Sequence, residues 1–454
     1  MSKITLLQAA QWCGGRVEPQ FQNVTFLGAG NDTRKLEPGQ LFVALEGVRD
    51  GHEFIDAAFE KGAAAVLCKH CHSKYPAIIV ENPRIALGQI AAGERQRLGM
   101  KVVGVTGSVG KSTTKEMIAA VLSGEYIVSK TPANFNNDLG MPMSVLAMPE
   151  NTQVAVLEMG MNHFGEIRYL TKIARPDVAV IINVGTMHIE NLGSREGILQ
   201  AKLEILEGMA PSGIVCFNGD NDLLQSCHVQ RPVTYFGTHE GCAVRAGDIR
   251  EEAQGIRFAV SARGQSFEVF LPVEGTHHVS DALAAVAVGL ALGVTPENIA
   301  LRLSCFQNMA GRQEIFAAKG CTIIKDCYNA GPESMAAALK VLGKRTGHRI
   351  AVLGDMLELG EHTVSSHLQA GMHAAQNADL LLSYGPHAHY MVQGAVDAGM
   401  PHSNAIAFTD RDAMARALKE RSVPGDTLLF KGSHGMHMEL VLDRFLTEET
   451  NREE

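Results

Sequence analysis

The sequence lacks long hydrophobic runs and an excess of positive charge. No window of it approaches the ~20 consecutive apolar residues that a membrane span requires. Residues 1–15 contain no apolar core of a secretion signal. The net charge of −9 argues against a general binder of nucleic acid or membrane surfaces. We therefore expect a cytoplasmic protein with no nucleic-acid or membrane partner, and we expect it to be a monomer.

Cysteine is also scarce, and the nine cysteines are scattered along the chain. An odd, scattered set predicts free thiols rather than a disulfide framework. One cluster, residues 68–72 (Cys-Lys-His-Cys-His), has the spacing of c-type haem attachment. It lacks the export signal that haem attachment usually requires, and no second cysteine pair for zinc accompanies it. We interpret this cluster as a surface loop that follows a strand.

The length of 454 residues is too great for one hydrophobic core and predicts two to four domains of ~100–200 residues. Residues 1–98 contain short strand and helix patterns, which indicate a small α/β domain. Residues 99–312 carry continuous Val/Ile/Leu runs, typical of buried strands in a mostly parallel, P-loop ATPase-like sheet, followed by an antiparallel hairpin. Residues 313–454 alternate strands and helices, as in a Rossmann-like, doubly wound domain. No G-x-G-x-x-G motif follows the first strand of that domain, so a dinucleotide cofactor is not supported.

Apolar runs and their periodicity also predict individual elements. The predicted strands lie at residues 41–45, 77–80, 102–105, 154–157, 178–182, 214–217, 257–261, 266–271, 322–324, 349–353, 379–383, 405–408 and 427–430. The predicted helices lie at residues 53–61, 85–97, 111–122, 278–292 and 333–342.

The strongest local pattern is a glycine-rich turn between a strand and a helix. This phosphate loop consists of Thr106, Gly107, Ser108, Val109, Gly110, Lys111, Ser112 and Thr113. Glycines let backbone N–H groups turn toward phosphate oxygens, and the helix N-terminus adds its positive end. Lys111 can bridge the β- and γ-phosphates of ATP, and the hydroxyl of Ser112 or Thr113 can hold Mg²⁺.

The phosphate loop departs from the strict motif at one position. The motif has glycine five residues before Gly110, where this chain has Val105. The loop is therefore a shortened variant, and its alternative interpretation is an ordinary glycine turn. The order of strand, G-K-S-T sequence and helix favours nucleotide binding.

Three further residues are candidates for magnesium binding. Glu158 ends a predicted strand, and residues at the carboxyl ends of parallel strands face the ligand crevice, where a carboxylate can hold Mg²⁺. His188 follows the next strand, and Lys202 lies on a helical stretch. Each has an ordinary alternative: a solvated strand-end acid, a polar loop residue and a solvated lysine. Spacing alone does not decide between them.

Several segments, taken together with the phosphate loop, resemble the Mur ligases of peptidoglycan synthesis. They are residues 32–34, 38–45, 50–52, 134–142, 158–162, 185–188, 202–205, 352–360 with His367, and 431–433. The resemblance spans about residues 24–440. It implies a first domain that binds a uridine nucleotide, a central domain that binds ATP, and a C-terminal domain that closes over ATP and helps to receive an amine.

Within the family, the resemblance implies ATP- and Mg²⁺-dependent joining of D-alanyl-D-alanine to UDP-N-acetylmuramoyl-tripeptide through an acyl phosphate. The implied catalytic residues are Lys111, Glu158, His188 and Lys202. The implied metal ligands are Ser112, Glu158, His188 and a carbamylated Lys202. Besides the phosphate loop, the implied ATP-binding residues are Asn137, His277, His278, Asp281, Arg312, Asp326, Tyr328 and Asn329. The implied substrate-binding residues are Thr33, Arg34, Gly51, His52, Asn134 and Asn136.

Four positions depart from the family pattern. His278 and Asp281 replace two asparagines near the adenine. Gly331 replaces another asparagine, and His434 stands where arginine is usual. The nearest alternative function is another Mur-type or folylpolyglutamate-type ligase. A P-loop kinase or nucleotide switch, and a non-catalytic binding protein, are alternatives from other classes. The sequence leaves open whether the third residue of the muramoyl peptide is diaminopimelate or lysine.

Overall fold

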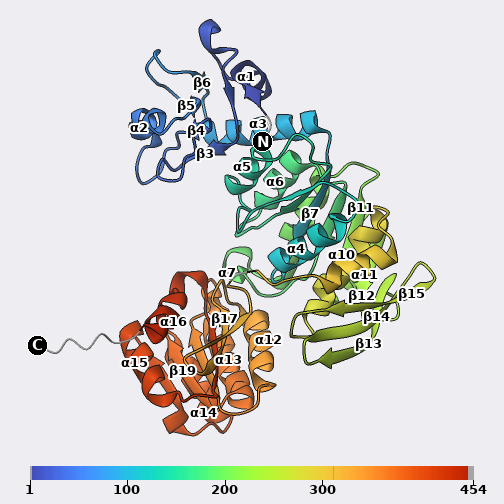
Figure 1. The fold of residues 1–454 in the computed structure, drawn as a ribbon, viewed down its shortest axis with the longest axis vertical. Coiled ribbons are helices and arrows are strands. Elements are labelled where there is room, and N and C mark those ends of the chain that lie inside the picture. The colour runs from blue at the N-terminus through green and yellow to red at the C-terminus, as the bar shows by residue number, and fades with distance from the viewer. Residues whose placement is uncertain (1–2, 310, 448–454) are drawn as a thin grey trace, which may run out of the picture.

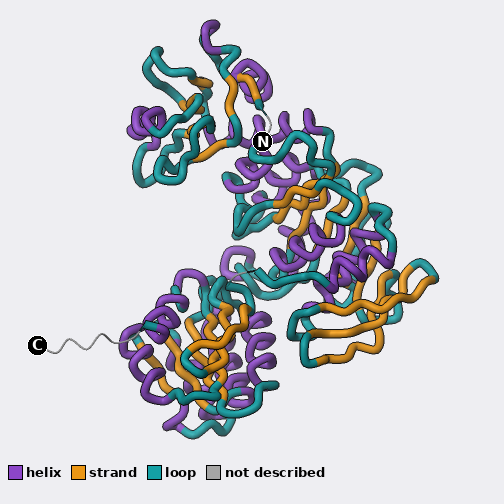
Figure 2. The backbone as a smooth tube through the Cα atoms, viewed as in Figure 1, coloured by secondary structure: helices purple, strands orange, loops and turns teal. Residues whose placement is uncertain are grey.

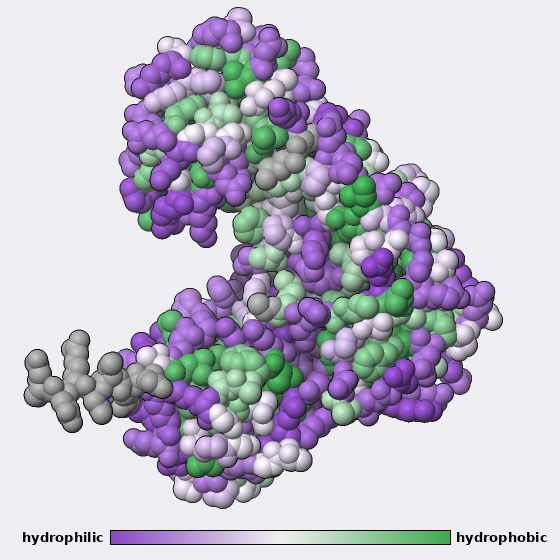
Figure 3. All heavy atoms as spheres, viewed as in Figure 1, coloured by the Kyte–Doolittle hydropathy of each residue, from purple (hydrophilic) through white to green (hydrophobic). Residues whose placement is uncertain are grey.

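The computed structural model describes residues 3–309 and 311–447 and contains three main sheets accompanied by helices (Figure 1). In chain order these sheets have four, nine and six strands, and we name the parts that carry them N-terminal, central and C-terminal. The two outer parts extend from the same side of the central part (Figure 2), and the surface is hollowed between them (Figure 3). The predicted α/β class with a mostly parallel central sheet is confirmed. The predicted domain boundaries after residues 98 and 312 stay predictions.

The sheet of the N-terminal part is parallel. Its strands, in spatial order, are β3 (Ala29–Gly30), β4 (Leu41–Val43), β5 (Ala65–Cys68) and β6 (Ala77–Ile79). A separate antiparallel pair consists of β1 (Ile4–Thr5) and β2 (Thr25–Phe26). The helices of this part are α1 (Leu6–Cys13), η1 (Pro19–Phe21), η2 (Gly51–Phe54), α2 (Ile55–Glu60) and α3 (Pro83–Leu98). Asn82 caps α3 through its side chain, and Gly99 ends the helix in the left-handed region, with φ 65°.

The central sheet has the order β15-β14-β13-β12-β11-β10-β7-β9-β8. Its strands are β7 (Lys101–Thr106), β8 (Val128–Lys130), β9 (Val154–Glu158), β10 (Val178–Ile181), β11 (Ile214–Asn218), β12 (Val233–Gly237), β13 (Val244–Glu252), β14 (Gly255–Ala262) and β15 (Gln265–Leu271). Neighbours from β8 to β13 are parallel, whereas β14 is antiparallel to both β13 and β15. The middle strands are mostly apolar, as expected where helices cover both faces of a sheet. These helices are α4 (Lys111–Leu122), α5 (Gly140–Leu146), α6 (Glu166–Ala174), α7 (Ile189–Leu192), α8 (Arg195–Leu203), η3 (Glu204–Gly208), α9 (Asp222–Gln225), α10 (His278–Ala291) and α11 (Pro296–Ser304).

Helix α3 joins the N-terminal part to the central part. Its buried residues Leu87 and Ile90 belong to the same apolar core as Leu67 and Ile78 of the N-terminal sheet. Leu157 of the central sheet belongs to this core as well, and α3 also packs on α5 and α6. One continuous core therefore extends from the first sheet to one face of the central sheet.

The sheet of the C-terminal part is parallel except at one edge. In spatial order its strands are β16 (Glu314–Ala318), β17 (Cys321–Asp326), β21 (Thr427–Lys431), β18 (Arg349–Gly354), β19 (Leu380–Tyr384) and β20 (Ala405–Phe408), with β16 antiparallel to β17. Its helices are α12 (Pro332–Gly343), η4 (Gly360–His362), α13 (Thr363–Asn377), α14 (Ala388–Asp397), η5 (His402–Asn404), α15 (Arg411–Arg421), η6 (His434–Met436) and α16 (Glu439–Leu446). Across all described residues, we find no helix with the length and apolar character needed to cross a membrane.

The strands and helices predicted from apolar runs are all present, with most ends shifted by one or two residues. The strands that the sequence did not predict include β8, β12 and β16, which are only partly buried. The surface-loop interpretation of residues 68–72 needs one correction. Cys68 is the buried last residue of β5, because it still pairs with the neighbouring strand, so the loop begins after it.

Leu283 tests the packing of the central part. Its side chain is fully buried in α10, which packs on α4 and β11. Replacing a buried leucine with alanine removes apolar contacts and leaves a cavity, which typically costs about 2–5 kcal/mol. We expect Leu283→Ala to lower the midpoint of urea unfolding followed by circular dichroism. Leu301→Ala on α11, at a residue 57% exposed, is the control and should change the free energy of unfolding by less than about 0.5 kcal/mol. An unchanged midpoint for Leu283→Ala would contradict this packing.

Candidate active site

The carboxyl edge of the central sheet faces a cavity of about 1180 Å³. Sites for one small molecule usually occupy about 300–1000 Å³, so this volume exceeds that of a typical single-ligand site. The cavity brings together most of the residues predicted from the sequence. Those that line it are Ser108, Val109, Gly110, Lys111, Ser112, Thr113, Asn134, Asn136, Asn137, Glu158, His188, His277, His278, Asp281, Arg312, Asp326, Tyr328 and Asn329.

The phosphate loop has the predicted strand–loop–helix form. Strand β7 ends at the buried Thr106, and α4 begins at Lys111. Gly110, directly before the helix, has φ 83°, and a Cβ at this position would lie 2.6 Å from Oδ1 of Asp281. Glycine is therefore required both by the backbone and by the space. The first N–H groups of α4 have no partner within the helix, so this end of the helix favours an anion in the cavity.

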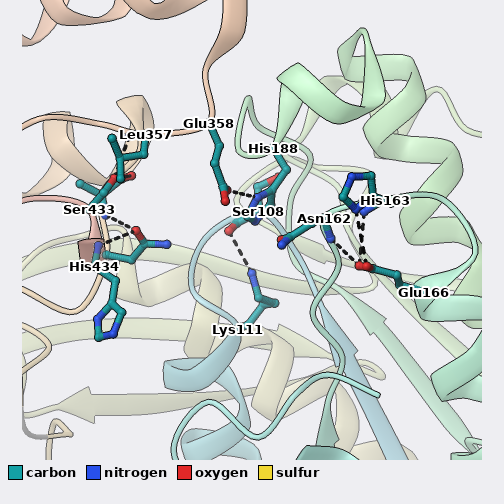
Figure 4. A network of polar contacts seen from close by, with 12 residues as sticks. Ser108, Lys111, Asn162, His163, Glu166, His188, Leu357, Glu358, Ser433 and His434 are labelled. Carbon is teal, nitrogen blue, oxygen red and sulfur yellow. Dashed lines mark hydrogen bonds and ion pairs between the residues drawn. The ribbon is translucent and has the colours of Figure 1, made fainter. Parts of the chain in front are cut away.

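The amine of Lys111 lies across the loop. Its Nζ donates hydrogen bonds to the carbonyl oxygens of Gly107, at 2.8 Å, and Ser108, at 3.1 Å. Figure 4 shows the bond to Ser108. Desolvation lowers the pKa of Lys111, the carboxylate of Glu158 opposes this shift, and the charge of Arg312 adds to it. An anion bound beside this amine would stabilise its charged form.

Glu158 is buried, with 1% of its surface exposed, so the alternative of a solvated strand-end acid is wrong. Its Oε2 accepts a hydrogen bond from the Ser112 hydroxyl at 2.6 Å, and its Oε1 accepts one from Asn136 Nδ2 at 2.8 Å. The amine of Lys115 lies 3.7 Å from Oε2. The guanidinium of Arg312 donates a hydrogen bond to Ser112 Oγ at 2.8 Å. Carboxylate, hydroxyl and guanidinium thus meet at the phosphate loop.

This donor set suits Mg²⁺. The ion prefers oxygen ligands and commonly binds through one or two carboxylates together with substrate phosphates. Glu158 and Ser112 supply such oxygens beside the first turn of α4. Within residues 3–309 and 311–447, no group of three or more His, Cys, Asp or Glu side chains is placed to hold a metal ion. The chain would therefore supply only part of the coordination, and phosphate oxygens and water the rest.

Lys202 is buried, so the alternative interpretation of a solvated lysine is wrong. It lies near the end of α8, with 2% of its surface exposed. Burial lowers the pKa of its amine well below the ordinary value, and the neighbouring charge of Lys111 lowers it further. The described part of the chain gives this amine no hydrogen bond or ion pair. An uncharged, buried amine is the form that this environment favours.

His188 meets the C-terminal part directly. It has φ 64° and precedes α7, and its Nδ1 lies 2.5 Å from Oε2 of Glu358 (Figure 4). The hydrogen bond from His188 lowers the pKa of the Glu358 carboxyl. Glu358 follows β18, so the pair joins the central part to the C-terminal part.

The two residues that replace asparagines of the family pattern, His278 and Asp281, contact each other. His278 Nδ1 lies 3.1 Å from Oδ2 of Asp281, and Oδ1 of Asp281 accepts a hydrogen bond from Thr114 at 2.7 Å. The other ring nitrogen of His278 lies 3.3 Å from Oε1 of Gln313. His277 is exposed, with its ring centroid 4.0 Å from that of His278. The departures from asparagine therefore form a bonded pair beside α4.

Residues 326–329 bring a further charged group to the cavity. Asp326 Oδ2 accepts a hydrogen bond from the amine of Lys431 at 2.6 Å, and this amine also donates to the carbonyl of Asn329 at 3.0 Å. The guanidinium of Arg312 stacks over the ring of Tyr328, 3.9 Å from its centroid. These contacts connect β17 and β21 with the phosphate loop.

The four predicted substrate-binding residues of the N-terminal part lie elsewhere. Thr33, Arg34, Gly51 and His52 are not among the described residues that line the cavity. Arg34 forms an exposed ion pair with Asp32. His52 is held by Asp50 on one ring nitrogen, and its other nitrogen accepts the backbone N–H of Lys69 at 3.0 Å. A ligand that contacts both groups must span the two parts.

Sequence reasoning missed three residues of the site. Asn183 binds the phosphate loop through its side chain, Lys115 is buried beside Glu158, and Lys431 pairs with Asp326. The sequence could have indicated Asn183, because it directly follows the strand predicted at residues 178–182 and so lies at the ligand-facing edge of the sheet. Lys431 lay within a family motif. Lys115 had no signal, because nothing in a helical sequence marks one lysine as buried.

Comparison with known families gives three consecutive matches. The "Mur ligase family, catalytic domain" matches residues 24–95, the "Mur ligase middle domain" residues 105–289, and the "Mur ligase, glutamate ligase domain" residues 311–434. The chain belongs to the Mur ligase family. It is 41% identical to a UDP-N-acetylmuramoyl-tripeptide–D-alanyl-D-alanine ligase of Bacillus subtilis, over 97% of this chain and 98% of that protein. It is 37% identical to the protein of the same name from Escherichia coli, with the same coverage.

Solved structures agree with this membership. MurF from Acinetobacter baumannii superposes with a TM-score of 0.90 at 32% identity, over 99% of this chain and 100% of that one. MurF ligase from Thermotoga maritima in complex with ADP has a TM-score of 0.81 at 31% identity, over 92% and 97% of the two chains. A folylpolyglutamate synthase from Mycobacterium tuberculosis has a TM-score of 0.63 at 15% identity, over 80% and 94%, and shares the fold alone.

Family membership identifies the chain as an ATP-dependent ligase that uses ATP with Mg²⁺. The alternatives of a P-loop kinase, a nucleotide switch and a non-catalytic binding protein are therefore not supported. The phosphate loop, predicted from local sequence, is present at the cavity of this ligase.

Lys111→Ala tests the phosphate loop. The variant removes a cation from the site where phosphate charge would accumulate, so we expect ATP-dependent product formation to fall by about 10³-fold or more. The circular-dichroism spectrum and unfolding midpoint should stay those of the wild type, because the hydrogen bonds of this amine within the described residues go to carbonyl oxygens of the loop itself. Lys101→Ala, at the exposed start of β7, is the control and should keep wild-type turnover. Near-normal turnover by Lys111→Ala would refute the assignment.

Proposed function

We propose that this chain joins D-alanyl-D-alanine to UDP-N-acetylmuramoyl-tripeptide, consuming ATP and releasing ADP and phosphate. The observation that carries the proposal is the meeting of Glu158, Ser112 and Arg312 at a phosphate loop, in a cavity larger than a typical single-ligand site. Relatives named for this reaction are 37% and 41% identical over nearly the full length. The product would be the pentapeptide precursor of peptidoglycan, which gives the protein a place in cell-wall synthesis, cell shape and cell division.

The chemistry follows from charge. A carboxylate is a poor electrophile for an amine, so transfer of the γ-phosphoryl group to the peptide carboxylate creates an acyl phosphate with a good leaving group. The transfer brings anions together, and Lys111 and Arg312 would neutralise part of that charge. Ser112 and Glu158 would hold Mg²⁺, which, when bound, offsets phosphate charge and orients the phosphoryl oxygens. The amine of D-alanyl-D-alanine then displaces phosphate.

A second metal position would involve His188 and Lys202. The amine of Lys202 is buried and has a strongly lowered pKa, so its neutral form can add to carbon dioxide, losing a proton and becoming a carbamate anion. Such an anion would suit a cation site, and its charge would be opposite to that of the neighbouring Lys111 amine. Carbamylation of Lys202 is part of the proposal.

We assign the remaining predicted site residues to substrate or ATP binding according to the part of the chain in which they lie. Residues 1–98 would hold the uridine nucleotide through Thr33, Arg34, Gly51 and His52, and residues 99–312 would bind ATP. Residues 313–454 would receive the amine substrate. The adenine side of the ATP site would consist of His277, His278 and Asp281, with Asn137, Asp326, Tyr328 and Asn329 around the nucleotide. Asn134 and Asn136 would contact the peptide. We also propose that the protein works in the cytoplasm as a monomer.

The choice of amine tests the proposal. We expect mass spectrometry to detect UDP-N-acetylmuramoyl-pentapeptide when the protein is given the tripeptide, ATP and D-alanyl-D-alanine. L-alanine, D-glutamate and diaminopimelate serve as competing amines, because the earlier ligases of this family would use such acceptors. ATP consumption stimulated by one of these amines, or ATP hydrolysis without a new amide, would refute the proposed substrate.

Glu158→Gln tests the metal site. The substitution keeps the size of the side chain but removes the charge that would hold Mg²⁺. We expect the Mg²⁺ concentration for half-maximal activity to rise by about 10- to 100-fold. Glu297→Gln, at an exposed position of α11, is the control and should leave the Mg²⁺ dependence unchanged. An unchanged Mg²⁺ dependence of Glu158→Gln would show that Glu158 does not bind Mg²⁺.

A further inference from the structure

Residues 183–188, which we call the coupling segment, lie between the phosphate loop and the C-terminal part. The segment follows β10 at the carboxyl edge of the central sheet. Figure 4 shows Glu358 reaching from the C-terminal part to His188, close to Ser108 and Lys111 of the loop. The contacts of the segment on its two sides are of different kinds.

On one side, the coupling segment fixes the shape of the phosphate loop. Oδ1 of Asn183 accepts the backbone N–H groups of Ser108, at 2.9 Å, and Val109, at 3.0 Å. The amide nitrogen of Asn183 donates to the carbonyl oxygen of Val109 at 3.0 Å. The backbone N–H of Gly185 donates to Ser108 Oγ at 2.9 Å. Movement of the segment would therefore change the path of the loop.

On the other side, two carboxylates of the C-terminal part hold the segment. Oε1 of Glu333, in the first turn of α12, accepts hydrogen bonds from the backbone N–H of Thr186 at 2.9 Å and from its hydroxyl at 3.1 Å. Oε2 of Glu358 lies 2.5 Å from Nδ1 of His188. His188 and Glu358 both have left-handed backbone conformations, with φ 64° and 62°, which are uncommon for non-glycine residues.

Two glycines allow this close approach. A Cβ at Gly185 would lie 2.6 Å from Oε1 of Glu333, so the carboxylate rests directly against the backbone of the segment. A Cβ at Gly331 would overlap the sulfur atom of Met187. Gly331 is the position where the family pattern has asparagine. Its lack of a side chain leaves room for a methionine of the segment.

We propose that Glu333 and Glu358 are positioning residues that couple docking of the C-terminal part to the shape of the phosphate loop, through the coupling segment. The inference rests on the proposed function, because the shape of the loop matters to the reaction only if the loop binds the ATP that the reaction consumes. Docking then arranges the phosphate-binding groups at the moment when the cavity is closed on its C-terminal side.

Hydrogen exchange of the full chain without ligands measures this coupling directly. We expect amides of residues 106–113 to exchange about tenfold faster in Glu333→Ala and Glu358→Ala than in the wild type. Glu361→Ala is the matched control, because the Glu361 side chain is 85% exposed and forms an ion pair with the neighbouring His362. Glu333→Gln keeps an oxygen acceptor for Thr186, so it should restore slow exchange.

Two readouts separate positioning from other roles. Amides of β18 and β19 should keep wild-type exchange, since faster exchange there would mean that the C-terminal part unfolds, and the inference would be wrong. In steady-state kinetics, kcat should fall by about 10- to 100-fold in Glu333→Ala, with little change in the KM for D-alanyl-D-alanine. A large rise in that KM with unchanged loop exchange would make Glu333 a substrate-binding residue instead.

The hydrogen-exchange experiment tests the coupling even if the wild type shows no turnover. If the wild type makes no amide but the loop responds as expected, the proposed function fails and the coupling stands. If both alanine variants leave the loop unchanged, the coupling is wrong whatever the activity. Should Glu333→Ala not fold, Gly331→Ala tests the same interface by wedging a methyl group against Met187. Faster loop exchange in that variant supports the coupling, and unchanged exchange overturns it.

Discussion

The site depends on one buried negative charge, the carboxylate of Glu158. Without partners, a carboxylate removed from water would be costly, but the Ser112 hydroxyl and the Asn136 amide donate hydrogen bonds to it. Lys111, Lys115 and Arg312 lie around it, so the cations outnumber the anion. Burial is the main cause of the lowered pKa of Lys111, and the charge of Arg312 adds to it. The cations around Glu158 create a local preference for anions in a chain whose net charge is −9. A phosphorylated ligand completes the charge balance that the protein leaves open.

Sheet topology explains how these groups meet. Thr106, Glu158 and Asn183 lie at or just after the carboxyl ends of β7, β9 and β10, and β7 lies between the other two strands. Parallel neighbours end on the same edge, so residues far apart in sequence arrive side by side. The helix after β7 then adds the N–H groups of its first turn. The active-site edge is therefore a direct result of a parallel order in the middle of the sheet.

What the sequence predicted, and what it did not, follows from how local each signal is. The phosphate loop was predictable because strand, glycines and helix are consecutive. The burial of Glu158 and Lys202 was not, because the side chains that shield them come from other segments. From the sequence, Gly331 was only a position where the family pattern has asparagine. The structure shows that Met187 lies where a side chain at residue 331 would be. His278 and Asp281 read as two separate departures, whereas they form one bonded pair. Burial and pairing depend on tertiary contacts that spacing along the chain does not report.

The continuous core around α3 bears on the length of substrate that the protein can accept. Leu87 and Ile90 belong to one core with residues of both the first sheet and the central sheet, so the part that carries His52 is packed directly against the part that carries Lys111. Under the proposed function, a substrate held by its nucleotide in the N-terminal part would have to reach the phosphate loop with its terminal carboxylate. One amino acid more or fewer would shift that carboxylate by up to about 3.5 Å, more than a reacting distance tolerates. The packing of the two parts would then select substrates by peptide length. No side chain would have to contact each residue of the peptide.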